Sequence, residues 1–231
     1  EFFTVLGAAG IGKSRLADEF LSDIDAQVVR GRCLSYGEGI TYWPVVEVLK
    51  QLDALPSDPA AAASLRSLLR ETEESTSAEE IAWAFRKLLE EQAQGKPLVC
   101  VFDDIHWGEE TFLDLVEHVA LLSTGAPILV LCLARSELAE RRPEWPVALR
   151  LEPLPEADVH ALIPERLPEE LRAKITHASG GNPLFVTEMV VMTVESEGEV
   201  AVPPTLQALL AARLDQLEAS ERSVLERGSV E

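Results

Sequence analysis

The stretch GAAGIGKSRL, residues 7–16, decides the fold of this chain because three closely spaced glycines run into a lysine, a serine and an apolar periodicity. Residues 7–14 match the pattern G-x-x-x-x-G-K-[ST] at every fixed position, and this pattern is meaningful only between a strand and a helix. Both conditions are met. FFTVL, residues 2–6, has the uncharged aromatic and β-branched character of a buried parallel strand, and apolar residues recur at helical spacing after Ser14.

The glycines of residues 7–14 predict a phosphate-binding loop. Without Cβ atoms, successive backbone N–H groups can curl inward into an anion-binding nest, which the positive end of the following helix reinforces. Lys13 then reaches the β and γ phosphates of a nucleotide, and the hydroxyl of Ser14 can bind Mg²⁺. The alternative is a glycine-rich turn with an accidental Lys-Ser pair. A second sequence motif is therefore needed to distinguish a phosphate-binding loop from such a turn.

That second motif is PLVCVFDDIHW, residues 97–107, in which an apolar run ends in Asp103 and Asp104. In an open parallel sheet, ligands bind beyond the carboxyl ends of the strands, where residues 7–14 and this pair would both emerge. We expect Asp103 to hold Mg²⁺, directly or through water, and Asp104 to orient or deprotonate the attacking water. Alone, such a run is more often a strand followed by a solvated turn.

The remaining pattern predicts an α/β fold with a mostly parallel sheet, followed by a helical appendage. Further strands are expected at residues 27–33, 98–102, 127–134 and 148–154, and helices at 14–24, 45–52, 64–74, 78–94 and 110–122. From 156 to 216 the pattern is helical, broken at 179–183 and 202–204. The loop 34–44 contains two glycines and a Trp-Pro step that exclude a simple helix there. Arg135, at the end of a strand, could face the γ phosphate or form a surface ion pair.

Composition excludes several classes of function. With 20 basic against 40 acidic residues, the net charge of −20 opposes binding to nucleic acid. The longest uncharged apolar run, residues 126–134, falls well short of the roughly 20 residues of a membrane-spanning helix. Three cysteines in separate apolar runs fit reduced thiols, and no secretory leader opens the chain. We therefore expect a cytoplasmic protein that binds neither nucleic acid nor membrane.

Several of these stretches together resemble the STAND class of AAA-like signalling ATPases. They are GAAGIGKSRL, PLVCVFDDIHW, the strand ending at Arg135 and GGNPLFVTEM (180–189). More narrowly, residues 31–49 and 213–231 are similar to the ATPase module of multidomain bacterial proteins. Those proteins join the module to an adenylate or guanylate cyclase domain or to a LuxR-type DNA-binding domain. The resemblance covers nearly the whole chain.

The resemblance implies a three-layer P-loop NTPase sandwich over residues 1–153, an all-helical lid over 154–203 and a truncated winged-helix start over 204–231. It implies that the nucleotide, ATP or ADP, is bound by Gly7, Ala8, Ala9, Gly10, Ile11, Gly12, Lys13, Ser14, Arg15 and Pro183, the last near adenine. Ser14 and Asp103 would hold Mg²⁺, Asp104 the catalytic water, and Arg135 would be the sensor arginine on a strand between the two motif strands. His106 and Trp107 fit the family pattern and receive no role.

Residues and resemblance together predict an Mg²⁺-dependent ATP-binding switch with slow hydrolysis. ADP would favour a closed form and ATP an open form able to self-associate, because a ligand shifts such an equilibrium by its differential affinity. Cyclase or DNA-binding output domains would be linked covalently, since the first strand starts at residue 2 and the chain ends within an element, as in an excerpt. Two alternatives stay open: an interaction scaffold with a vestigial site, and a small-molecule kinase.

Overall fold

The computed structural model describes residues 1–35, 41–69 and 76–195. The chain divides into two compact units, one formed by Glu1–Ala9 and Lys13–Leu151, the other by Gly10–Gly12 and Glu152–Glu231. The expected winged-helix start at 204–231, the break at 202–204 and the last residues of the expected lid lie outside the described residues. The roles assigned to the three predicted parts stay predictions.

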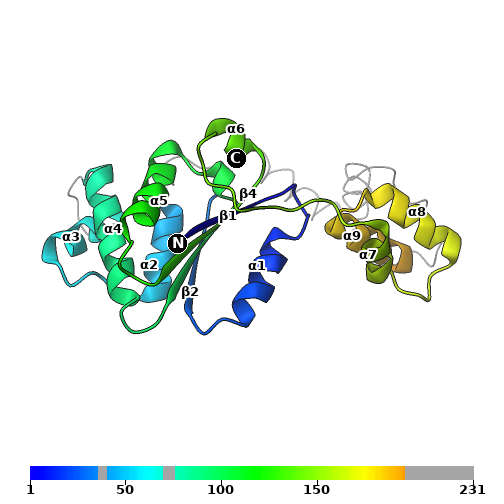
Figure 1. The fold of residues 1–231 in the computed structure, drawn as a ribbon, viewed down its shortest axis with the longest axis horizontal. Coiled ribbons are helices and arrows are strands. Elements are labelled where there is room, and N and C mark those ends of the chain that lie inside the picture. Colours follow the sequence, from blue (N-terminus) through cyan, green and yellow to red (C-terminus); the bar gives the residue numbers. More distant parts are fainter. Residues whose placement is uncertain (36–40, 70–75, 196–231) are drawn as a thin grey trace, which may run out of the picture. The chain divides into compact units, whose positions relative to one another are not determined.

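A parallel sheet forms the centre of the first unit (Figure 1). Its described strands are β1 Phe2–Leu6, β2 Gln27–Arg32, β3 Leu98–Asp103, β4 Ile128–Ala134 and β5 Leu149–Arg150. Their spatial order is β2-β3-β4-β1-β5. This confirms the expected α/β fold with a parallel sheet, and β4 lies between the strands that carry the two motifs.

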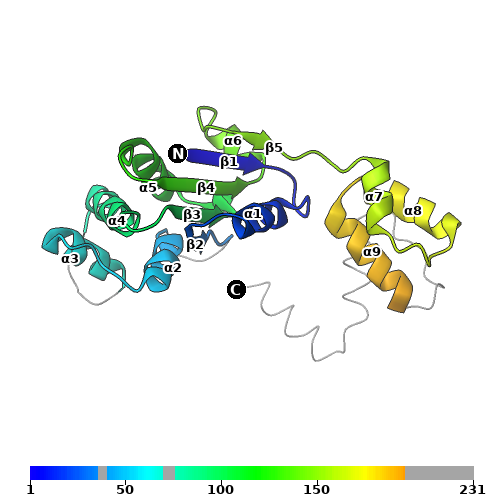
Figure 2. The ribbon, with the colours of Figure 1, turned by 60° about the horizontal axis from the view of Figure 1, so that its bottom comes forward.

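Helices cover both faces of this sheet (Figure 2). In the described ranges they are α1 Lys13–Ser22, α2 Trp43–Leu52, α3 Pro59–Leu68, α4 Ala78–Gln92, the 3₁₀ turn η1 Ile105–Trp107, α5 Glu110–Leu122 and α6 Glu137–Arg141. α2, α4 and α5 lie on one face, with α3 packed on α4, and α1 lies on the other. The sheet is thus the middle of three layers, with α2, α4 and α5 in one outer layer and α1 in the other.

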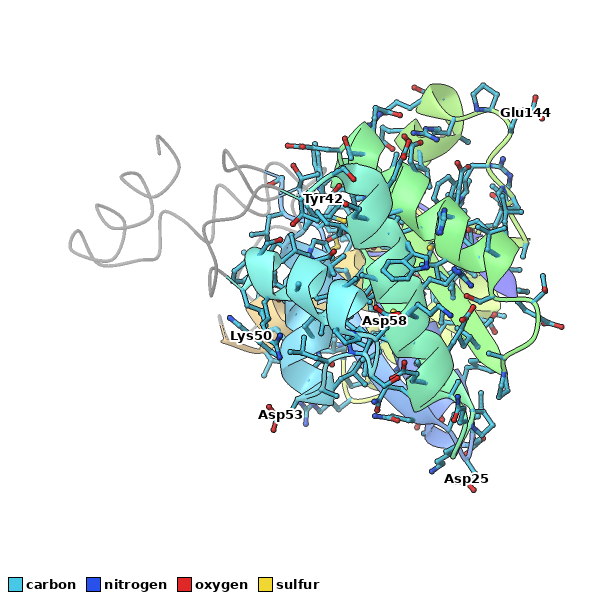
Figure 3. The ribbon with its side chains drawn as sticks, turned by 90° about the vertical axis from the view of Figure 1, so that its left-hand side faces the viewer. Asp25, Tyr42, Lys50, Asp53, Asp58 and Glu144 are labelled. Carbon is cyan, nitrogen blue, oxygen red and sulfur yellow. The ribbon has the colours of Figure 1, made fainter. Side chains whose placement is uncertain are left out.

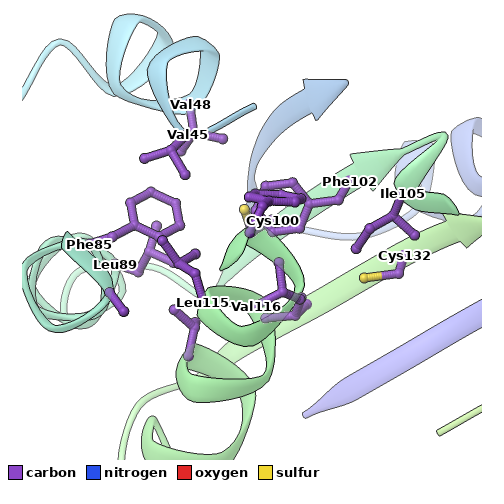
Figure 4. Close-up of a cluster of buried hydrophobic side chains, with 14 of the residues drawn as sticks. Val45, Val48, Phe85, Leu89, Cys100, Phe102, Ile105, Leu115, Val116 and Cys132 are labelled. Atoms are coloured by element: carbon purple, nitrogen blue, oxygen red, sulfur yellow. The ribbon is translucent and has the colours of Figure 1, made fainter. Parts of the chain in front are cut away.

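The larger core lies on the α2, α4 and α5 side of the sheet. Figure 4 shows Val48 of α2, Phe85 of α4 and Val116 of α5 in one buried cluster with Phe102 of β3. The ring of Phe102 also meets Phe112 edge to face, with centroids 5.2 Å apart. A smaller core joins alternate residues of the same strands to α1. Because both faces are covered, β3 and β4 are continuous apolar runs rather than alternating ones.

Two helices begin earlier than expected. The helix predicted at 64–74 starts at Pro59, because Asp58 caps it by accepting from the backbone N–H groups of Ala60 (2.9 Å) and Ala61 (3.1 Å). Asp58 is labelled in Figure 3, which views the first unit from the side where α3 and α4 lie. The helix expected from residue 45 starts at Trp43, since proline in the first turn of a helix leaves no hydrogen bond unmade.

The last strand is shorter than the predicted 148–154. β5 comprises only Leu149 and Arg150, which pair with Val5 and Leu6 of β1. The N–H of Leu151 still donates to the carbonyl of Leu6 (2.8 Å), but β1 ends there and its chain turns into the loop, so the residues after Leu151 have no strand to pair with. The prediction of a seven-residue strand was wrong for this reason.

Apart from Gly10–Gly12, the secondary structure in the described part of the second unit is helical. It contains α7 Glu156–Leu162, α8 Glu169–Ser179 and α9 Pro183–Glu195, around a core that includes Val159, Ile175 and Met189. The expected break at 179–183 is present. A further break separates α7 from α8, where Pro164 and Pro168 interrupt the predicted helical region. None of the helices in the described ranges combines the length and the apolar character needed to cross a bilayer.

Candidate functional site

The glycine-rich loop leaves β1 at the carboxyl end of the sheet. The N–H of Gly7 still donates to the carbonyl of Ala134 on β4 (3.1 Å), so the loop starts as a continuation of the ladder. Gly10 and Gly12 then adopt φ values of +74° and +101°, a region that residues with a Cβ rarely enter. The two glycines are thus required by the turn that the backbone makes here.

Lys13, the first residue of α1, turns its side chain back into this loop. Its Nζ donates to the carbonyl oxygens of Gly7 (2.8 Å) and Ala8 (2.9 Å), and the residue is only 8% exposed. Burial lowers the pKa of Lys13, while the nearby charge of Asp104 acts in the opposite direction. The ammonium is thus held by the carbonyls of the glycine-rich loop itself.

Ser14 and Asp103 come together although they are far apart in the sequence. Ser14 Oγ, in the first turn of α1, donates to Asp103 Oδ2, at the end of β3, over 3.1 Å. The other oxygen, Asp103 Oδ1, accepts from the backbone N–H of Asp104 (2.8 Å). A hydroxyl and a carboxylate are hard oxygen ligands of the kind that Mg²⁺ prefers. The residues present therefore fit the predicted magnesium site.

Asp104 points to a different partner. It has left-handed backbone angles (φ 52°, ψ 33°), which turn the chain sharply after β3 into η1. Its Oδ2 accepts from Arg32 Nη2 (2.8 Å) and from Arg32 Nε (3.1 Å). These bonds raise the pKa of Arg32 above its usual value. The two adjacent carboxylates therefore face separate groups, one a serine hydroxyl and the other a guanidinium.

Arg32 is a site residue that the sequence analysis missed. It ends β2, in register with Asp103 of β3, so its side chain emerges at the same carboxyl edge as the two motifs. A usable signal was present: residues 27–33 were expected to form a strand, and a charged residue at the carboxyl end of such a strand is a candidate ligand contact.

Arg135, directly after β4, contacts an aromatic ring. Its guanidinium carbon lies 5.9 Å from the ring centroid of Trp107, a cation–π contact. Among the described residues Arg135 has no ion-pair partner, so the second of the two alternatives, a surface ion pair, is not what this part of the structure shows. Burial is the main cause of the lowered pKa of Lys13, and the charge of Arg135 also lowers it, so Arg135 acts electrostatically on the lysine of the loop. Its predicted role at the γ phosphate stays a prediction.

His106 is the second residue whose position the sequence did not reveal. It lies in η1 and is only 4% exposed, and burial lowers the pKa of its ring below the ordinary value, with Asp104 opposing that effect. Its carbonyl accepts from Arg141 Nη1 (2.8 Å). The family pattern included His106, but the burial of a single histidine leaves no periodicity in the sequence, so its environment could not be predicted.

The other predicted binding residues differ in their exposure. Ala8, Ala9 and Arg15 are exposed, whereas Ile11 is buried. Pro183 is the first residue of α9 in the second unit. The contacts to nucleotide assigned to these five residues stay predictions.

The sequence of residues 1–131 matches the family described as the AAA ATPase domain. The chain belongs to this family. Membership supports a nucleotide-binding domain of the ATPase type. It agrees with the strand, loop and helix arrangement around Lys13 and with the carboxylates at the end of β3.

The chain is also similar to longer proteins. An uncharacterized protein of Rhizobium meliloti (strain 1021) is 27% identical over 266 residues, covering 92% of this chain and 26% of that protein. A Signal Transduction ATPase with Numerous Domains (STAND) protein with a tetratricopeptide repeat sensor from Pyrococcus horikoshii has a similar structure (TM-score 0.53, 17% identity, 100% of this chain, 32% of that one). So does a variant of RuvB from Thermotoga maritima (TM-score 0.51, 13% identity, 98% and 67%). This AAA ATPase domain thus spans about a quarter of the bacterial relative and shares its fold with both solved structures.

Proposed function

We propose that this AAA ATPase domain binds ATP together with Mg²⁺ and hydrolyses it slowly, as a regulatory switch. The observation that carries the proposal is the 3.1 Å contact between Ser14 Oγ and Asp103 Oδ2. It joins the two predicted magnesium ligands, one from the glycine-rich loop and one from the end of β3. A solvated turn after β3, unrelated to the loop, would have no reason to place a carboxylate on that hydroxyl.

Each candidate residue at the carboxyl end of the parallel strands then has one role. Backbone N–H groups of the loop and the ammonium of Lys13 bind the phosphates, with Lys13 exchanging the carbonyls of Gly7 and Ala8 for phosphate oxygens. Ser14 and Asp103 hold Mg²⁺, which neutralises charge on the β and γ phosphate oxygens when bound. Asp104 orients the attacking water and accepts its proton. Arg135 stabilises negative charge that develops on the terminal phosphate.

We infer that the switch works inside a larger bacterial protein of the cytoplasm. The relative from Rhizobium meliloti is about four times as long as the part that this chain covers, which leaves room for covalently linked output domains such as a cyclase or a DNA-binding domain. The STAND protein of similar fold is named for signal transduction. ADP and ATP would favour different forms, and the ATP form would associate with further copies of itself.

The test is a calorimetric titration of the chain with ATP in the presence of Mg²⁺, beside Lys13→Ala. We expect saturable binding that disappears in the variant, because the ammonium of Lys13 is the side-chain cation assigned to the β and γ phosphates of the bound nucleotide. Omitting Mg²⁺ should weaken ATP binding, and Ser14→Ala should reduce this dependence. Normal ATP binding by Lys13→Ala would contradict the proposal, and an absence of binding by both proteins would favour the scaffold alternative.

Hydrolysis is tested separately from binding. Asp104→Asn keeps the shape of the side chain but is a much weaker proton acceptor. We therefore expect ATP to bind with unchanged affinity and the single-turnover rate of hydrolysis to fall by about 100-fold or more. An unchanged rate would remove Asp104 from the catalytic step while leaving the binding proposal intact.

A further inference from the structure

A buried histidine next to the candidate site has no part in the proposed function so far. His106 is 4% exposed, and neither of its ring nitrogens has a hydrogen-bond partner in the described part of the chain. Buried polar groups are nearly always paired, because an unpaired one forfeits the hydrogen bonds that it makes to water in the unfolded chain. A phenylalanine ring would fill the same space without that loss. Packing alone therefore does not account for an imidazole here.

The position of His106 is fixed from two sides. Arg141 Nη1 donates to the carbonyl of His106 (2.8 Å) and Arg141 Nη2 to that of Gly108 (3.1 Å), which holds the backbone of η1 against α6. On the other side, the imidazole lies 5.0 Å from the ring of Trp107, centroid to centroid, and Trp107 itself meets the guanidinium of Arg135. The ring is therefore positioned by the protein before any ligand binds.

The charged groups that act on this ring are those of the candidate site and of the start of α6. They are Asp104, Arg135, Glu137 and Lys13. Apart from Glu137, each has a proposed role toward the nucleotide. Burial favours the neutral imidazole, which carries one N–H donor and one acceptor nitrogen. His106 thus brings an unused donor to a place where cations and carboxylates of the site converge.

Lys13, one of the charges that act on the His106 ring, is itself buried. Lys13 is 8% exposed, and its ammonium is bonded to the carbonyls of Gly7 and Ala8. An incoming phosphate has to draw the ammonium away from these carbonyls, which admits an anion to the space around Lys13. A phosphate oxygen is a strong acceptor, and a hydrogen bond to a charged acceptor is stronger than one between neutral groups.

We propose that His106 is a further nucleotide-binding residue, whose ring N–H donates to the terminal phosphate of a bound nucleoside triphosphate. The inference rests on the proposed function, since it requires a nucleotide in the glycine-rich loop. It adds selectivity to that function, because a nucleoside diphosphate lacks the acceptor. Binding of a third phosphate would then affect η1 through His106, and α6 through the hydrogen bonds of Arg141 to the backbone of His106 and Gly108.

The experiment compares a non-hydrolysable ATP analogue, AMPPNP, with ADP, each in the presence of Mg²⁺ and with the whole chain. His106→Phe keeps a ring of similar shape and removes both nitrogens, whereas His106→Gln keeps a donor. We expect His106→Phe to weaken AMPPNP binding by about tenfold and ADP binding by less than about twofold. His106→Gln should lie between His106→Phe and the unchanged chain.

His118→Phe is the matched control. His118 lies on α5, is partly buried, also has an unpaired ring nitrogen and also has its pKa lowered by burial, but the charge that acts on it is that of Arg86. We expect this variant to bind both nucleotides as the unchanged chain does. Thermal unfolding without nucleotide shows which variants are folded, and His106→Gln carries the test if His106→Phe is not.

Two results would overturn the inference. One is unaltered affinity of His106→Phe for AMPPNP, and the other is an equal loss of affinity for AMPPNP and ADP, as a purely structural role would give. The proposed function fails differently: the unchanged chain binds neither nucleotide, or Lys13→Ala binds as well as it does, and the inference then falls with it.

A second readout observes the ring directly. The chain has four histidines, so its ¹⁵N-imidazole NMR spectrum is simple, and the spectrum of His106→Gln assigns the signals of His106. We expect these signals to move on addition of AMPPNP with Mg²⁺ and to move less with ADP. Signals that stay in place with AMPPNP would overturn the inference.

Discussion

The carboxylate of Asp104 is held through one oxygen by Arg32, and this contact governs how the residue can act. Both donors of Arg32 meet Oδ2, so the guanidinium fixes the direction in which the carboxylate faces. The pair is unequal in exposure, with 65% of the Arg32 side chain and 20% of the Asp104 side chain accessible. Under the proposed function Arg32 is a positioning residue, and its exposed side chain can be truncated without disturbing the core.

We expect Arg32→Ala to lower the rate of ATP hydrolysis by about tenfold while the affinity for ATP changes little. The reason is that Asp104 would spend less time in one orientation, whereas the contacts of Lys13 and Ser14 are untouched. Single-turnover hydrolysis and calorimetry measure the two quantities. Arg30→Ala is the control, because Arg30 lies on the same strand and pairs with Asp18 on α1 instead. Hydrolysis at the original rate in Arg32→Ala would contradict this role.

The buried ring of His106 predicts a pH dependence of stability. Its pKa in the native chain is lowered from the ordinary 6.5 by burial. Between the two pKa values the unfolded chain therefore binds a proton on this ring and the native chain does not. The resulting stability is present above pH 6.5 and is lost as the pH falls from there toward the lowered value. Urea unfolding should therefore show a smaller loss between about pH 7 and 5.5 for His106→Phe than for the unchanged chain. Parallel pH profiles would contradict the prediction.

Among the elements, α3 depends on a single capping residue. Asp58 accepts from two of the first N–H groups of the helix, which have no partner within the helix itself. We expect Asp58→Ala to reduce the free energy of unfolding by about 1 kcal/mol. Asp58→Asn keeps an acceptor oxygen and should cost less, which separates capping from a change of helix propensity. Equal urea midpoints for Asp58→Ala and the unchanged chain would show that Pro59 alone starts the helix.

The sequence predicted those elements whose signal is local. Strand β4 is apolar throughout, β3 is apolar up to its final Asp103, and β1 carries no charge. The glycine, lysine and serine pattern of residues 7–14 indicates phosphate binding directly. The start of α3 was missed because the prediction placed the helix from residue 64, whereas the cap that starts it is Asp58. The end of β5 was missed because it depends on where β1 ends. Contacts between distant residues, such as Arg32 with Asp104, need the strand order, which no local pattern contains.

At the scale of the whole molecule, net charge decides how copies can meet. A charge of −20 makes two copies repel, and this repulsion is screened as the Debye length falls from about 30 Å at 0.01 M salt to about 3 Å at 1 M. If Mg²⁺ and AMPPNP drive self-association, sedimentation velocity should show it strengthen by about tenfold or more over this range. Lys13→Ala should stay unassociated throughout, because it lacks the nucleotide that selects the associating form. Association that weakens with salt would instead require an interface built from ion pairs between opposite charges, and the 20 basic residues of the chain would then have to gather at it.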